Sequence, residues 1–155
     1  MDYDYDYTYS DGAAAGTILA IYGAFFLFSL VFAAAVYVLM ALALSSFFKK
    51  VGVESWIAWV PIYNTWKWLE VGGQQGWLAL ISLIPYGSIV TAVFLYIGMY
   101  RTGIAFGRDT GFFELGLFLP LVWAFMLGQK DANYEPQRLA YAGYPPPLAG
   151  YGSAR

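Results

Sequence analysis

Residues 56–64 read WIAWVPIYN, a short run of apolar and aromatic residues that a proline interrupts. The run is too short to cross a bilayer, which takes about 20 apolar residues, and too apolar for a loop in water. Trp and Tyr side chains favour the headgroup layer of a membrane, where one end of the ring is dry and the other wet. Pro61 lacks a backbone N–H and restricts Val60, so we predict that a helix over residues 56–60 ends or kinks there.

The residues around this run extend the prediction. Trp56 and Tyr63 supply aromatic rings, and Asn64 can cap a second helix that begins near Thr65. Lys67, one turn further on, can reach out to the headgroups. We therefore predict a helix, a turn and another helix that lie in or dip into the membrane interface. An ordinary loop between two membrane spans is the alternative.

The composition indicates an integral membrane protein. Of the 155 residues, 60% are hydrophobic and 12% are charged, about half the charged share of a soluble domain. The chain has no cysteine and no histidine, which excludes disulfides, thiol nucleophiles, the Ser-His-Asp triad and the usual zinc sites. We expect no metal and no cofactor. The net charge of −2 gives no excess of basic residues of the kind that indicates nucleic-acid binding.

The sequence divides into one expected membrane domain, residues 16–130, between two polar tails. Residues 1–15 are acidic and Tyr-rich, residues 131–155 are rich in Pro, Gly and Tyr, and we expect both tails to be disordered. The clearest span covers residues 16–44. Lys49 and Lys50 follow it while its other flank is acidic, so the positive-inside rule places the N-terminus outside and the lysines in the cytoplasm.

Two further apolar stretches each contain a proline. Residues 77–105 begin at Trp77 and are interrupted at Pro85, and we favour two antiparallel arms over one kinked span. Residues 112–127 form the last expected span, with Pro120 at its middle. The candidate caps for that helix are Asp109 and Thr110. The predicted fold is an all-α integral membrane protein, a small bundle of about three to four spans with Pro-broken helices and an interfacial helix-turn-helix.

One candidate polar pair lies near the ends of these stretches. Arg101 ends a long apolar run and Glu114 begins the next, so the two side chains can meet across the polar turn at residues 107–111. An ionisable residue within a span is a functional candidate by default. The alternative, which we favour, is that both side chains lie at the level of the headgroups, where Arg snorkels freely.

A candidate packing surface lies on the first span. Gly16, Ala20 and Ala24 fall four residues apart and form one ridge of small side chains, which allows helices to approach closely in lipid. Alanine is abundant in this segment, so chance is the competing explanation.

Ser45 and Ser46 lie four residues before Lys49 and Lys50, respectively. On a helix this spacing would allow a serine and a lysine to form a Ser–Lys dyad. Lysines that flank a span are solvated and protonated, however, and nothing nearby resembles a substrate groove. We therefore expect no catalysis from these residues.

Residues 30–130 resemble a family of small bacterial membrane domains of unknown function. The pattern is W-x-x-x-(I/V)-P-x-Y-N, then a Trp-led run ending in Ile-Pro, then FG(K/R) before a last apolar segment with its own proline. The residues that carry it are Trp56, Pro61, Tyr63, Asn64, Trp77, Ile84, Pro85, Phe106, Gly107, Arg108 and Pro120. In some bacteria a similar domain precedes a signal peptidase I catalytic domain; elsewhere it stands alone. The resemblance implies an architecture and no reaction.

These observations predict a non-enzymatic protein of the bacterial plasma membrane, an accessory, scaffold or assembly subunit of a larger membrane complex. Membrane lipids and a protein partner or a second copy of the chain are its expected partners. Two alternatives stay open: a small oligomeric transporter or channel with Arg101 and Glu114 along its path, and a lipid-handling or membrane-shaping module.

Overall fold

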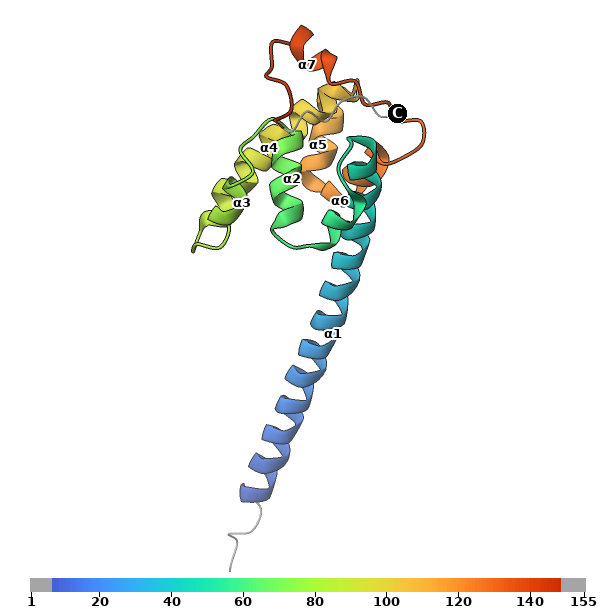
Figure 1. The fold of residues 1–155 in the computed structure, drawn as a ribbon. Coiled ribbons are helices and arrows are strands. Elements are labelled where there is room, and N and C mark those ends of the chain that lie inside the picture. The colour runs from blue at the N-terminus through green and yellow to red at the C-terminus, as the bar shows by residue number, and fades with distance from the viewer. Residues whose placement is uncertain (1–6, 149–155) are drawn as a thin grey trace, which may run out of the picture. The chain divides into compact units, whose positions relative to one another are not determined.

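The computed structural model describes the backbone of residues 7–148 and the side chains of residues 12–148 (Figure 1). Every regular element in that range is helical. The elements are α1 (Tyr7–Lys50), the 3₁₀ helix η1 (Ser55–Trp59), α2 (Tyr63–Val71), α3 (Leu78–Ile81), α4 (Gly87–Ala105), α5 (Thr110–Phe118), α6 (Pro120–Leu127) and α7 (Gln137–Tyr141). The chain forms two compact units, one up to Tyr37 and one from Val38 onward.

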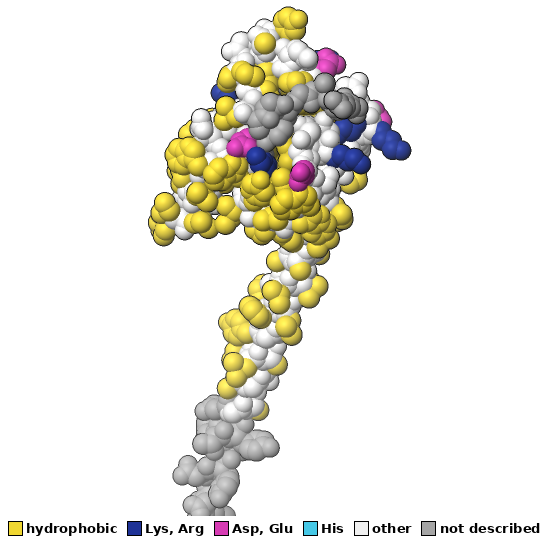
Figure 2. Space-filling view, in the orientation of Figure 1, with side chains coloured by type: hydrophobic (Ala, Val, Ile, Leu, Met, Phe, Trp, Pro, Cys, Tyr) yellow, Lys and Arg dark blue, Asp and Glu magenta, His cyan; other side chains and the backbone are white. Residues whose placement is uncertain are grey.

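The first unit is the N-terminal part of α1. Its sequence contains no proline and is rich in Ala, which favours a helix. The Thr17 and Ser29 hydroxyls donate to the carbonyls of Ala13 and Phe25, one turn back, so these polar side chains are satisfied within the helix. Between Gly12 and Tyr37 nearly every side chain is exposed, and Figure 2 shows hydrophobic atoms and no charged side chain along this stretch. The expected disorder up to residue 15 is therefore wrong from Tyr7 onward, while residues 1–6 lie outside the described range.

The second unit is built on the last turns of α1. Phe47 and Phe48 are fully buried there, and Lys49 and Lys50 end the helix, where basic charge suits the negative end of its dipole. Gly52 then takes a φ of 79°, and the Val53 N–H donates to the Phe48 carbonyl over 2.9 Å. A left-handed glycine with a bond back across the last turn is the usual helix stop.

Aromatic rings fill the core of this unit. The Phe47 ring lies 5.6 Å from that of Trp123 and 6.4 Å from that of Trp68, and the two indoles stack at 5.9 Å. Leu139 is also buried, so elements α1, α2, α6 and α7 share one core. Such ring pairs contribute beyond the area that they remove from solvent.

Proline breaks the helices at the three expected places. Pro61 follows η1, and Ile62 after it takes a φ of 66°. Tyr86 after Pro85 takes a φ of 64°, and Pro120 is the first residue of α6. Proline is well suited to the first turn of a helix, where its missing N–H has no partner to lose.

The stretch from α3 to α4 is a tight antiparallel hairpin. The Thr91 hydroxyl donates to the Leu78 carbonyl over 2.8 Å, and a Cβ added to Gly87 would lie 1.8 Å from the Ile81 carbonyl oxygen. These contacts require the chain to reverse at residues 82–86, as favoured from the sequence. The first arm holds only the short helix α3, and turns with hydrogen bonds to the third residue back flank it on both sides.

The last apolar stretch differs from the expected span. Residues 112–127 form two short helices, α5 and α6, that separate at Leu119 (Figure 1). The rings of Phe112 and Trp123 lie 6.1 Å apart, whereas a straight helix would separate their backbones by about 16 Å. The chain therefore turns back at Pro120. Within the described residues, two helices are long and apolar enough to cross a membrane, Gly12–Lys50 and Gly87–Ala105, and not three to four.

The expected C-terminal tail is folded as far as residue 148. Ala132, Tyr134 and Leu139 are buried against the core. The Lys50 ammonium donates to the carbonyls of Lys130 and Ala132 over 3.0 and 3.2 Å. The prediction of disorder from residue 131 was wrong because it relied on the Pro/Gly-rich composition and overlooked these three apolar residues, which pack on the core. Residues 149–155 lie outside the described range.

Candidate functional site

A groove on the second unit brings an arginine into apolar surroundings. It has a volume of about 480 Å³, which falls within the range of small-molecule sites. Most of its wall comes from α4, with one residue from α5 and one from the segment after α7. The lining residues are Val93, Tyr96, Ile97, Tyr100, Arg101, Phe113 and Tyr144.

Arg101 is the one charged residue of this lining. Its guanidinium carbon lies 5.7 Å from the centre of the Tyr144 ring, a cation–π distance. Its Nε is buried and has no hydrogen-bond partner. Within residues 12–148, the ion pairs are Lys67–Glu70 and Glu135–Arg138, and neither involves Arg101. A buried donor without an acceptor is uncommon in a folded protein.

The candidate pair of Arg101 and Glu114 does not form within the described residues. Asp109 caps α5 by accepting from the Phe112 N–H over 3.0 Å, which confirms one of the two candidate caps and fixes the rotation of the helix. In that rotation Phe113 packs on Tyr100, with ring centres 5.5 Å apart, while Glu114 is exposed. Adjacent helix residues point about 100° apart, so Phe113 lines the groove and Glu114 does not.

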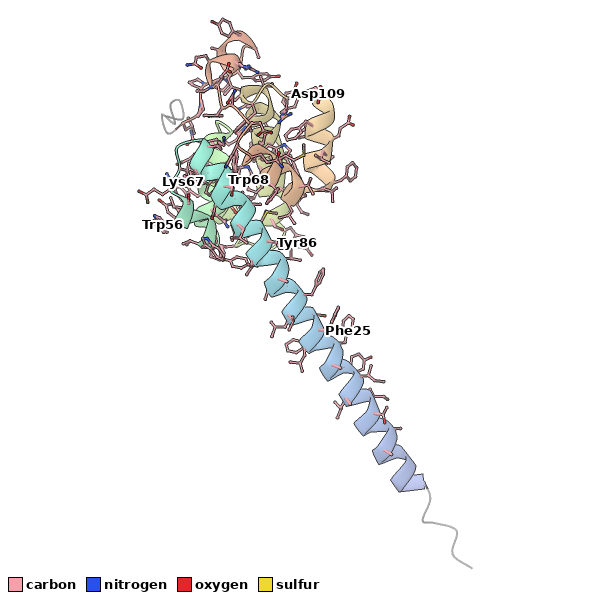
Figure 3. The ribbon with its side chains drawn as sticks, turned by 90° about the vertical axis from the view of Figure 1, so that its right-hand side faces the viewer. Phe25, Trp56, Lys67, Trp68, Tyr86 and Asp109 are labelled. Atoms are coloured by element: carbon pink, nitrogen blue, oxygen red, sulfur yellow. The ribbon has the colours of Figure 1, made fainter. Side chains whose placement is uncertain are left out.

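The WIAWVPIYN run folds into η1 and the start of α2. The Trp56 and Tyr63 rings lie 6.1 Å apart on the surface, and the Trp56 indole donates to Glu54. Together with Lys67 these residues line a second hollow of about 260 Å³. Figure 3 shows Trp56 and Lys67 on one side of the unit and Asp109 on the other.

Asn64 does not cap the helix that follows it. The helix α2 begins at Tyr63, one residue earlier, and Ile62 precedes it without a side-chain cap. The Asn64 amide instead donates to the Ala58 carbonyl over 3.2 Å and so joins α2 to η1. The cap prediction was wrong because the chain turns at Ile62, which has a positive φ, and the helix begins directly after it. Asn64 therefore lies inside α2 and not at the residue before it.

The other predicted residues occupy exposed places. Trp77 and Pro85 lie at the two ends of the α3 arm, whose tip exposes Leu83, Ile84 and Tyr86. Gly16, Ala20 and Ala24 are exposed on α1, and a Cβ added to Gly16 would meet nothing within 4 Å. The small-residue ridge thus has no partner among the described residues.

Three of the residues considered for a Ser–Lys dyad, Ser45, Ser46 and Lys50, have other partners. The Ser45 hydroxyl donates to the Ser55 carbonyl over 3.0 Å, and Ser46 donates to the Leu42 carbonyl over 3.2 Å. The Lys50 ammonium is held by the carbonyls at Lys130 and Ala132. Residues 12–148 contain no group of three acidic side chains placed to hold a metal ion.

The described chain is an all-helical protein with two helices of membrane-spanning length and composition. A family model matches residues 56–137, from Trp56 to the start of α7, and the chain belongs to this family of unknown function (DUF5684). The expectation of an uncharacterised family is thereby confirmed. The association with signal peptidase stays a prediction. No curated protein and no solved structure matches the chain.

Proposed function

We propose that the protein is a non-enzymatic subunit of the bacterial plasma membrane that scaffolds or assists assembly of a membrane complex. The observation that carries this proposal is the exposure of α1. Consecutive large side chains such as Phe25, Phe26, Leu27 and Phe28 are each more than 60% exposed, although they point to different sides of the helix. A helix that is apolar on all sides requires burial in lipid or against other helices.

The length of the exposed stretch fits a bilayer. Residues 12–37 extend about 39 Å at 1.5 Å per residue, and the hydrocarbon core is about 30 Å thick. The acidic N-terminal flank and the basic Lys49 and Lys50 support an orientation with the N-terminus outside. The excess length is accommodated by tilt.

The scaffold role is supported by what α1 offers to a neighbour. Helices in lipid associate through close packing of small residues because lipid gives no hydrophobic drive between them. Gly16, Ala20 and Ala24 form such a surface, and it is exposed. The transporter alternative relied on Arg101 and Glu114 along one path, and the structure does not bring those residues together, so we do not propose it.

The test is photocrosslinking in native membranes. A photoreactive amino acid at Leu27, on the same helix face as Ala20 by the helical repeat, should give a defined adduct with another protein or a second copy of the chain. The double substitution Ala20→Leu with Ala24→Leu should reduce that adduct severalfold while insertion is kept, because Leu inserts at least as well as Ala.

The matched control is Ala15→Leu with Ala33→Leu. These residues lie on the opposite side of α1 by the same repeat, so the adduct should be unchanged. The scaffold proposal fails if the wild type forms no adduct, or if the control pair reduces the adduct as much as the ridge pair.

A further inference from the structure

We propose that the groove along α4 binds one anionic phospholipid, with its phosphate on the Arg101 guanidinium and an acyl chain along Val93 and Ile97. This inference rests on the membrane location proposed above and adds a ligand to it. Two turns of α4 separate Val93 from Arg101, about 12 Å along the helix axis. The groove therefore has an apolar end and a cationic end, as a phospholipid has a chain and a headgroup.

The apolar part of the groove suits an acyl chain. The side chains of Val93 and Ile97 are both exposed on α4, and α4 is one of the two helices long and apolar enough to cross a membrane. An acyl chain can lie along these two exposed apolar side chains. An inorganic phosphate would leave this part of the groove empty.

The cationic end suits a phosphate. Arg101 is the only charged residue of the lining, and no acidic residue of the described range pairs with it. A guanidinium presents parallel donors that match phosphate oxygens, and such charge-assisted bonds are stronger than neutral ones. The Arg101 guanidinium can therefore bind a phosphate in this groove.

Two tyrosine rings frame the cationic end. Tyr100 and Tyr144 meet edge to face with ring centres 6.1 Å apart, and Tyr144 also faces Arg101. Tyrosine rings are favoured at the boundary between acyl chains and headgroups because they are apolar with a polar tip. The rings therefore place Arg101 at the depth where the phosphate of a lipid lies.

The experiment uses the full chain purified in mild detergent, with phosphatidylglycerol and phosphatidylcholine of the same acyl chains as probes. Native mass spectrometry measures retained lipid, and the midpoint of thermal unfolding measures the stabilisation that binding gives. The wild type should retain phosphatidylglycerol in preference to phosphatidylcholine. Arg101→Gln should weaken phosphatidylglycerol binding by about tenfold or more, since it removes a charge-assisted contact.

Two control variants separate the site from general effects. Arg108 lies just beyond α4, is exposed, and faces Phe112 outside the groove, so Arg108→Gln removes a nearby charge and should bind as the wild type does. Ile97→Trp should fill the groove and weaken binding, whereas Ile89→Trp, on the same helix but outside the lining, should not. The second pair keeps the test decisive if Arg101→Gln fails to fold.

Several results would overturn the inference. The first is equal retention of phosphatidylglycerol and phosphatidylcholine by the wild type. The second is an equal loss of phosphatidylglycerol binding in Arg101→Gln and Arg108→Gln, or in Ile97→Trp and Ile89→Trp. The third is stabilisation by inorganic phosphate alone that is as large as the stabilisation by phosphatidylglycerol. A chain that resists alkaline extraction from membranes yet retains no phosphatidylglycerol would refute the lipid site and leave the membrane proposal intact. Release by alkaline extraction would refute the membrane proposal itself.

Discussion

In the second unit the backbones of α2 and α4 approach closely at Gly72 and Gly98. This contact predicts how much each of three glycine-to-alanine substitutions changes the stability of the protein. A Cβ added to Gly72, at the end of α2, would lie 2.3 Å from the Cα of Gly98 in α4. Ordinary contacts of a Cβ begin at 3.4 Å, so Gly72→Ala forces the two backbones apart by about 1 Å. Overpacking of this kind costs about 1–3 kcal/mol in the free energy of unfolding.

Two other glycines of α4 provide the comparison. A Cβ added to Gly98 would lie 3.3 Å from the Gly72 Cα, and one added to Gly103 would meet nothing within 4 Å. Replacing glycine by alanine inside a helix gains about 0.8–1.0 kcal/mol. Gly103→Ala should therefore stabilise the protein, and Gly98→Ala should stay within about 1 kcal/mol of the wild type because the tight contact offsets the gain.

The assay is thermal unfolding of the purified variants in one mild detergent, followed by circular dichroism. Gly72→Ala and Gly103→Ala should differ by about 2–4 kcal/mol, and each kcal/mol shifts the midpoint by about 2–4 °C for a chain of this size. A Gly72→Ala variant that melts at or above the wild type would refute the close approach of α2 and α4.

Two further predictions concern the turn after η1 and the orientation of the chain. Asn64→Ala should lower the free energy of unfolding by about 1 kcal/mol, because the bond to the Ala58 carbonyl is lost. Asn64→Asp also lacks the donor and should lower the free energy of unfolding by a similar amount. An Asn64→Asp variant as stable as the wild type would contradict this assignment. In the cysteine-free chain, Thr8→Cys should react with an impermeant thiol reagent in intact cells and Gln75→Cys should not; the reverse labelling would overturn the proposed orientation.

The breaks in the helices were predictable because they depend on local covalent chemistry. Pro61, Pro85 and Pro120 each break or kink a helix because proline lacks the backbone N–H. Asp109 caps α5 by accepting from the N–H of Phe112, three residues further on. The direction that the chain takes after each break depends on distant contacts. Pro120 could leave a kinked span or a reversal, and the packing of Trp123 against Phe47 and Phe112 selects the reversal.

The groove could not be predicted from the sequence for the same reason. Arg101 was recognisable as an unusual charge at the end of an apolar run, but Glu114 was the only partner that spacing suggested. Tyr144 belongs to a segment whose composition indicates disorder. Its place beside Arg101 is due to the buried Leu139 and to the bond between the Leu148 N–H and the Glu70 carbonyl. Single apolar anchors in a Pro/Gly-rich segment carry no periodic signal.

The bonds from Lys50 to the segment after α6 also affect how the chain is made. Lys50 and Ala132 are 82 residues apart in the sequence, and translation at about 5–20 residues per second separates their synthesis by about 4–16 s. For most of that interval Phe47 has been synthesised while Trp123, whose ring packs on it, has not. The core of the second unit therefore cannot close until most of the chain has been synthesised, and its apolar residues stay uncovered for several seconds.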